Sequence, residues 1–229
     1  MSRQTVLPLD TRGLSSLDSF AGSRNRPLVA ELKLLVSGAR QARIMYVWGP
    51  PGSGKTHLLN ASCIENRRSG RSSYYLSLEE GPDSGIGCLT DHDSLVCIDN
   101  LECIDLDGDM QEALFHTYEM LHAGQGRMLV SANRPLAEIG LTLRDIDSRL
   151  SSGGVFQIHP LSDEEKKDAL RRRAKDKGFA LDDAVINYIL AHHSRQPRDL
   201  FGLLDRLGSE SLRHQRKITV PFMKDLLRE

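Results

Sequence analysis

Short apolar runs and helical periods alternate along the first two thirds of the chain. An apolar run over 44–48 ends in glycine, and a segment with helical spacing follows it over 55–68. A further helical pattern carries Met110, Leu114 and Leu121. The strand-like runs lie at 44–48, 73–78, 95–99, 128–132 and 155–158. Strands that alternate with helices favour a parallel sheet covered on both faces.

Beyond Pro160 the strand-like runs largely stop and helical patterns take over. Ser162 and Glu165 form an S-x-x-E capping box that opens a charged helix, and Gly178 closes that helix. Apolar residues recur at helical spacing in three further segments. We therefore expect a helical subdomain over residues 161–229.

The beginning of the chain has a different texture. Residues 1–22 contain no sustained period, and proline, glycine and serine interrupt them repeatedly, which predicts an extended, mobile arm. The first helix follows, with Asn25 as its expected cap and Pro27 in its first turn. The α/β unit is expected over residues 23–160.

The composition is that of a globular protein. Of the 229 residues, 39% are hydrophobic and 27% are charged, which excludes a wholly disordered chain. The net charge of -1 argues against both a large DNA-binding surface and a polybasic membrane anchor. The four cysteines form no C-x-x-C pair, and no apolar stretch approaches the ~18 residues of a membrane span. We expect a soluble, intracellular protein with reduced thiols and no membrane partner.

The strongest chemical signal is the segment GPPGSGKT over 49–56, which matches G-x-x-x-x-G-K-[ST] in full. It follows a predicted strand and opens a predicted helix, as a phosphate-binding loop requires. Glycines let successive backbone N–H groups turn toward one anion, and the helix N-terminus adds partial positive charge. Lys55 can reach the β- and γ-phosphates, and the Thr56 hydroxyl can hold Mg²⁺. The predicted nucleotide-binding residues here are Gly49, Pro50, Pro51, Gly52, Ser53, Gly54, Lys55, Thr56 and His57.

A second signal is the apolar strand over 95–99, which ends in an aspartate. Asp99 would lie at the end of the sheet near the phosphate loop, where it can serve Mg²⁺ through water. A P-loop ATPase commonly carries a second carboxylate at the next position to orient the attacking water, but this chain has Asn100. An amide cannot accept a proton as a carboxylate can, and Glu102 is displaced along the turn. We therefore expect slow self-catalysed hydrolysis.

Further polar positions fit the same site. Ser131 and Asn133 end the next strand, where a polar side chain could sense a γ-phosphate. Arg149 precedes the last strand, and Arg198 lies at the start of a predicted lid helix. Either arginine taken alone is more often a surface side chain in a weak salt bridge. Their positions relative to the strands make them candidates.

This arrangement of phosphate loop, aspartate-bearing strand, polar strand end, arginine and helical lid resembles the AAA+ ATPases. Within them, the chain resembles the AAA+ core of the bacterial replication initiator DnaA from about residue 25 onward. The segments that carry this resemblance are SANRP (131–135), DSRL (147–150) and PRDLFGLLDRL (197–207). The resemblance implies an α/β fold, with a P-loop AAA+ core built on a parallel five-stranded sheet and a C-terminal helical lid.

The arm adds a second resemblance. Residues 4–9, QTVLPL, are similar to a sliding-clamp-binding peptide of pattern Q-x-x-L-P-L. The two leucines could enter an apolar pocket, and the proline limits the backbone freedom lost on binding. The clamp-binding candidates are Gln4, Leu7, Pro8 and Leu9. A DnaA-like core joined to such a peptide, with LVCIDNLECI over 95–104, resembles the Hda family of DnaA regulatory inactivators.

The Hda resemblance implies a negative regulator of DNA replication initiation. With the DNA-loaded sliding clamp, the β subunit of DNA polymerase III, such a protein stimulates hydrolysis of ATP on DnaA and leaves inactive ADP-DnaA. Arg149 then corresponds to an arginine finger acting in trans, and Arg198 to a second sensor that contacts the chain's own nucleotide.

The resemblance also implies cofactors and partners. The cofactors are ADP, or ATP, with Mg²⁺ held by Thr56 and, through water, by Asp99. The partners are DnaA, the clamp, and DNA indirectly through the clamp. AAA+ cores often associate head to tail, but the sequence leaves open whether this chain forms a homo-oligomer. The implied location is cytoplasmic, at the nucleoid through the clamp.

Two other interpretations remain open from the sequence. The chain could be an autonomous AAA+ ATPase that acts as a remodelling factor of the helicase-loader kind, which requires substantial turnover despite Asn100. A weaker alternative is an inert scaffold with a vestigial site, which predicts no nucleotide binding.

Overall fold

The computed structural model describes residues 16–104, 108–194 and 197–226. The chain divides into two compact units, one ending at His159 and the other beginning at Pro160. In the described ranges, no helix has the length and apolar character that crossing a membrane needs.

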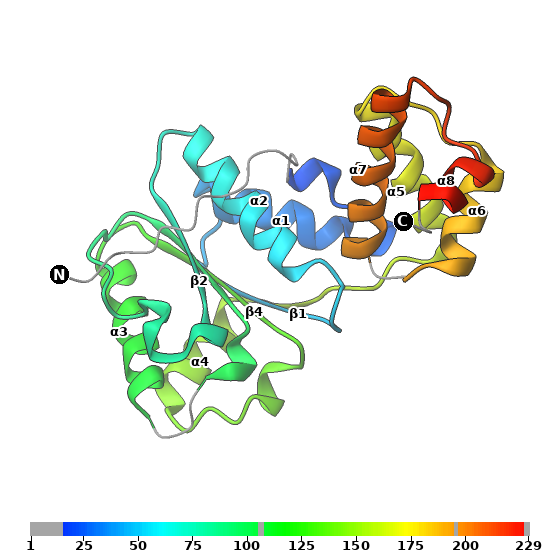
Figure 1. Cartoon of the computed structure of the whole chain (residues 1–229). Helices are drawn as coiled ribbons and strands as arrows, with labels where there is room; N and C mark the ends of the chain where they lie inside the picture. The colour runs from blue at the N-terminus through cyan, green and yellow to red at the C-terminus, as the bar shows by residue number, and fades with distance from the viewer. Residues whose placement is uncertain (1–15, 105–107, 195–196, 227–229) are drawn as a thin grey trace. The chain divides into compact units, whose positions relative to one another are not determined.

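The first unit is built on one sheet of five parallel strands in the order β2-β3-β4-β1-β5 (Figure 1). The strands are β1 (Ile44–Trp48), β2 (Ser73–Ser77), β3 (Leu95–Asp99), β4 (Arg127–Ala132) and β5 (Val155–Gln157). The five-stranded parallel sheet expected from the sequence is therefore confirmed.

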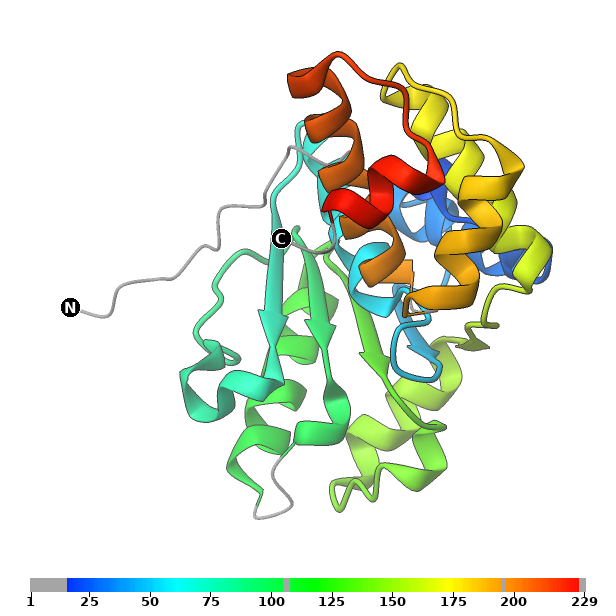
Figure 2. The same cartoon turned by 45° about the vertical axis from the view of Figure 1, so that its right-hand side comes forward.

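Helices cover both faces of this sheet, as Figures 1 and 2 show. Because strand side chains alternate, Met45 and Val47 of β1 face one way, where they pack in a core with α1 (Arg26–Ser37) and α2 (Lys55–Arg68). Ile44 and Tyr46 face the other way, in a second core with α3 (Asp109–Ala123) and α4 (Arg144–Gly153). The 3-10 helices of this unit are η1 (Leu17–Ser19), η2 (Ser23–Asn25), η3 (Leu78–Ser84), η4 (Leu101–Cys103) and η5 (Leu136–Glu138).

The described part of the N-terminal arm differs from the expectation of a mobile segment up to residue 22. Leu17 in η1 is only 2% exposed and packs in the core formed with α1 and α2. Asn25 makes no side-chain cap at α1; its amide instead donates to the carbonyl of His159 at 2.9 Å and accepts from the N–H of His159 at 2.8 Å. Residues 16–25 are therefore part of the α/β unit.

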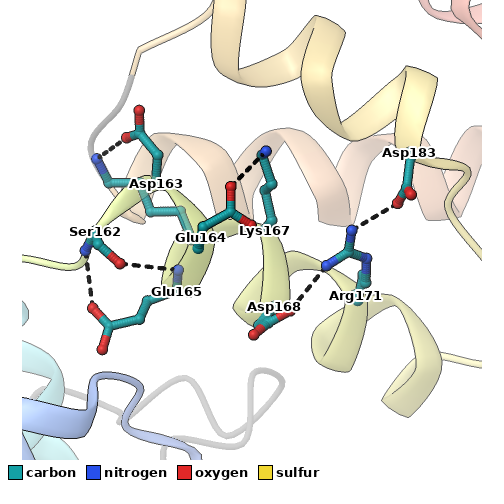
Figure 3. Close-up of polar contacts among 9 residues, drawn as sticks. Ser162, Asp163, Glu164, Glu165, Lys167, Asp168, Arg171 and Asp183 are labelled. Atoms are coloured by element: carbon teal, nitrogen blue, oxygen red, sulfur yellow. Dashed lines mark hydrogen bonds and ion pairs between the residues drawn. The ribbon is translucent and has the colours of Figure 1, made fainter.

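The second unit is a bundle of α5 (Asp163–Asp176), α6 (Asp183–His192), α7 (Pro197–His214) and α8 (Val220–Leu226) around its own apolar core. The predicted capping box forms at α5: the Ser162 hydroxyl accepts from the N–H of Glu165, and the Glu165 carboxylate accepts from the N–H of Ser162 (Figure 3). Figure 3 also shows Arg171 of α5 between Asp168 and Asp183, so one guanidinium joins α5 to α6.

The four cysteines are free thiols in two contrasting environments. Cys63 on α2 and Cys97 on β3 are fully buried in the same core. Cys88 and Cys103 are exposed.

Candidate phosphate-binding site

The predicted phosphate loop connects β1 to α2 as the motif requires. The backbone turns at Gly52 and Gly54, both in the left-handed region, and the first helical bond of α2 runs from the N–H of Leu58 to the carbonyl of Gly54 at 3.0 Å. The positive φ of Gly54 favours glycine, and a Cβ there would lie 2.7 Å from the ring of Phe20, which would have to shift. The N-terminal N–H groups of a 14-residue helix thus point toward the loop.

Lys55 is enclosed within the loop that it serves. Its ammonium donates to the carbonyl of Gly49 at 2.8 Å and to that of Pro50 at 3.3 Å. Burial lowers the pKa of Lys55, and the carboxylates of Glu102 and Asp99 act in the opposite direction. A phosphate group would offer this poorly solvated cation a stronger partner than two carbonyls.

Phe20 is a site residue that the sequence analysis missed. Its ring covers Gly54 and stacks with the His57 ring at 5.9 Å between centroids and 30° between planes. His57 was expected at the site because it adjoins the loop. Phe20 carries no local signal, because its position depends on how residues 16–25 pack against the core.

The Asp99 carboxylate accepts hydrogen bonds from three side chains and one backbone N–H of the α/β unit. One carboxylate oxygen, Oδ2, accepts from the Thr56 hydroxyl at 2.6 Å and from the Tyr75 hydroxyl at 2.8 Å. The other, Oδ1, accepts from the Ser131 hydroxyl and from the N–H of Asn100 at 3.1 Å. The carboxylate is fully buried, so its desolvation is offset by these donors.

The two polar residues predicted at the end of the next strand, Ser131 and Asn133, have different contacts. Ser131 reaches the aspartate, whereas Asn133 does not: its side chain is exposed, and its amide oxygen accepts from Arg134 at 3.3 Å. The Asn133 backbone N–H donates to the Glu102 carboxylate at 3.1 Å. Asn100 adopts a left-handed conformation and donates from its side chain to the Ser77 hydroxyl at 3.1 Å.

Arg149 lies on α4 with its side chain exposed. Its guanidinium carbon is 5.7 Å from the centroid of the Tyr118 ring on α3, and this ring also stacks with His122 at 5.5 Å. Across the described residues, no carboxylate forms an ion pair with Arg149. The guanidinium is thus held by an aromatic face while its hydrogen-bond donors stay available.

Some predicted residues cannot be placed. Gln4, Leu7, Pro8 and Leu9 lie outside the described residues, and so does the side chain of Arg198. Within the described part of the chain, no group of three or more His, Cys, Asp or Glu residues could hold a metal ion. The Mg²⁺ expectation therefore depends on Thr56 and Asp99.

Comparison with known families decides the relationship of the chain. A model of the bacterial DnaA ATPase domain matches residues 16–157, more than half of the chain. The chain belongs to this DnaA-related AAA+ family. In this DnaA-family chain, residues 163–227 match a second model, described as the lid domain of Hda. The resemblance suggested by the sequence motifs is confirmed at the level of the family.

Solved structures share the fold of this DnaA-family chain. Domain III of the Thermotoga maritima DnaA is 18% identical, with 93% of this chain and 95% of that one covered at a TM-score of 0.76. AMPPCP-bound DnaA from Aquifex aeolicus is 21% identical, with 90% and 70% covered at 0.69. The RuvB Holliday junction branch migration motor of Thermotoga maritima is 20% identical, with 94% and 72% covered at 0.66. These similarities confirm the AAA+ fold with its helical lid.

Proposed function

We propose that this DnaA-family chain is a negative regulator of replication initiation that stimulates hydrolysis of ATP bound to DnaA. It would bind ADP or ATP at its own phosphate loop and present Arg149 in trans to the nucleotide of DnaA. The match of residues 163–227 to the Hda lid supports this role over that of an initiator. The product would be ADP-DnaA.

The observation that carries the proposal is the exposure of the Arg149 side chain together with its contacts. The side chain is exposed on α4, no carboxylate of the described residues neutralises it, and its guanidinium rests against Tyr118. A planar, permanently charged group in this state can stabilise charge on a transferring γ-phosphoryl group of another subunit.

The chain's own site supports binding more than turnover. Asn100, at the position where a catalytic carboxylate would be expected, is bonded to Ser77, and an amide cannot act as a general base. The enclosed Lys55 and the N-terminus of α2 offer the positive charge that a bound phosphate needs. Bound nucleotide would then act as a ligand of the regulator more than as its substrate.

The sliding clamp is the proposed second partner. The peptide over residues 4–9 has the pattern Q-x-x-L-P-L, and the chain's net charge of -1 provides little general attraction to DNA. Docking on a DNA-loaded clamp would bring the regulator to DNA and raise its effective concentration near DnaA.

The test is single-turnover hydrolysis of ATP pre-bound to DnaA, measured with this chain, ADP and DNA, with and without loaded clamp. We expect wild-type protein to accelerate hydrolysis only with loaded clamp. Arg149→Ala should return the rate to that of DnaA alone, because fingers supplied in trans are worth about 10³–10⁵ in rate.

Arg144→Ala is the matched control, since Arg144 is an exposed arginine at the first residue of the same helix. This variant should stimulate hydrolysis normally. A folded Arg149→Ala protein with full stimulation would refute the proposed role.

The alternative is an autonomous AAA+ ATPase that remodels DNA complexes in the manner of a helicase loader. Glu102 is the observation in its favour, because this carboxylate, three residues after Asp99, accepts from the N–H of Asn133 just beyond β4 at 3.1 Å. Steady-state ATPase of the isolated chain separates the two functions. Substantial turnover that Glu102→Gln abolishes would support the autonomous enzyme.

A further inference from the structure

Asp99 has its full complement of hydrogen-bond donors within the protein. An ionised carboxylate offers about four lone-pair sites on its two oxygens. Thr56 and Tyr75 donate to Oδ2, while Ser131 and the N–H of Asn100 donate to Oδ1. The side chain is 0% exposed, so a further donor cannot approach from solvent without displacing one of the four.

The four hydrogen bonds to the Asp99 carboxylate affect how this site could bind Mg²⁺. Mg²⁺ keeps several of its waters when it binds nucleotides, and in P-loop proteins the ion is held by the loop Ser or Thr and by the aspartate of the neighbouring strand. The Thr56 hydroxyl oxygen retains a lone pair for such an ion. Asp99, as the structure shows it, does not fit a water-bridged contact, because each of its lone pairs already faces a protein donor.

Tyr75 donates to Asp99 from β2, the strand that pairs with β3. Thr56 belongs to the phosphate loop, Ser131 ends the adjacent strand, and the Asn100 N–H is the backbone group directly after Asp99. Tyr75 comes from β2, where it pairs in register with Cys97 two residues before Asp99. Side chains two apart on a strand share a face, so the tyrosine lies on the same face as Asp99 and its hydroxyl reaches the carboxylate.

The tyrosine hydroxyl is a stable donor in this position. A phenol hydroxyl is protonated at neutral pH, and that of Tyr75 donates to Oδ2 of Asp99 at 2.8 Å. The ring packs against the core that contains Cys63 and Cys97, which limits its freedom to turn away.

We propose that the Tyr75 hydroxyl takes the place of a magnesium-bound water at Asp99, so that this chain binds adenine nucleotide with little dependence on Mg²⁺. The inference rests on the proposed nucleotide site and adds a property to it. It concerns binding alone, and it assigns to Tyr75 a positioning role that no motif predicts.

The experiment is calorimetric titration of the full chain with ADP, once with Mg²⁺ and once with excess EDTA. For wild type, the two dissociation constants should differ by less than about threefold. A hydrogen bond to a charged group is worth roughly one to two orders of magnitude in an equilibrium constant. In Tyr75→Phe, which frees one lone pair of Asp99, Mg²⁺ should therefore tighten ADP binding by about 10-fold or more.

Tyr74→Phe is the matched control, because it removes the same atom from the adjacent residue of β2. Tyr74 points to the opposite face of the sheet and packs against the core formed with α3 and α4. This variant should behave as wild type does. Mn²⁺, which prefers similar oxygen ligands, gives a second readout: electron paramagnetic resonance should detect more bound ion with ADP on Tyr75→Phe than on wild type.

The outcomes are distinct. A strong Mg²⁺ dependence in wild type overturns the inference without any variant, and so does a folded Tyr75→Phe protein that stays insensitive to Mg²⁺. Absence of ADP binding under both conditions, in wild type as well, would overturn the proposed nucleotide site itself.

Discussion

Two charged residues of this molecule, Asp99 and Arg149, differ in whether their hydrogen-bonding groups are already used within the chain. Asp99 is fully buried with its oxygens bonded to four donors, whereas Arg149 is exposed with its donors available. Asp99 is therefore held in place by its own chain, whereas Arg149 can bind a group on a partner. For Arg149, orientation matters as much as charge, because a flexible arginine loses entropy when it engages a phosphate.

Tyr118 is expected to provide this orientation. A cation–π contact at an exposed site contributes about 0.5–1 kcal/mol, which corresponds to roughly a two- to fivefold effect on a rate or affinity. Tyr118→Leu should therefore reduce the stimulated hydrolysis rate of DnaA-bound ATP by about that factor, in an assay with loaded clamp. Tyr118→Phe keeps the aromatic face and should retain the rate. Equal loss in both variants would argue against the stacking role.

At the scale of elements, ion pairs link the helices of the lid unit. Asp205 on α7 accepts from Arg173 of α5 at 2.9 Å and contacts Lys177 at 3.0 Å, while Arg173 also lies over the Phe201 ring at 4.9 Å. Burial acts to raise the pKa of Asp205, but the bonds from Arg173 and Lys177 outweigh it and leave the pKa below its usual range.

The lowered pKa of Asp205 predicts the direction in which the free energy of unfolding changes with pH. The folded state holds the Asp205 proton less tightly than the unfolded state does, so the stabilisation is complete above the unfolded pKa of about 3.9 and is lost as pH falls through the folded pKa. For a partly exposed pair, Asp205→Asn should lower the free energy of unfolding by up to about 1 kcal/mol at pH 7. In urea titrations, the gap to wild type should narrow only below about pH 4.

Asp199→Asn is the control for this prediction, since Asp199 is an exposed aspartate in the first turn of the same helix. This variant leaves the contacts of Asp205 with Arg173 and Lys177 in place, so the pH-dependent gap attributed to those contacts should be absent. A gap between Asp205→Asn and wild type that stays constant from pH 7 to below the unfolded pKa would contradict the assignment.

Elements were largely predictable from the sequence because their signals are local. Two strands, β1 and β3, have the expected bounds, and the helix after the phosphate loop begins at Lys55 as expected. Contacts that depend on strand register or packing were not predictable. Tyr75 had only the signature of a strand residue, and Asn25 had that of a helix cap before the structure showed it bonded to His159.

At the scale of the whole molecule, fold and family agree on the organisation of the chain. The DnaA ATPase-domain match ends at residue 157 and the Hda lid match begins at 163, on either side of the boundary between the two compact units. The sequence had indicated this division by the loss of strand-like runs after Pro160. The amino-acid content of residues 16–22 did not indicate that they pack against the core, because short packed segments and short mobile segments contain similar residues.

The alkylation rates of the two buried thiols, Cys63 and Cys97, should report how often the α/β unit opens locally. Alkylation requires a thiolate in contact with reagent. Burial raises the pKa of Cys97, whereas the contact with the Cys97 thiol lowers the pKa of Cys63, so enclosure in the shared core is what should protect both thiols until α2 detaches from the sheet. Mass spectrometry should find the exposed thiols of Cys88 and Cys103 modified first and the other two slowly. ADP at 100 times its dissociation constant should slow this second phase by about 100-fold if it dissociates before α2 detaches. Fast modification of all four cysteines would show that α2 opens freely.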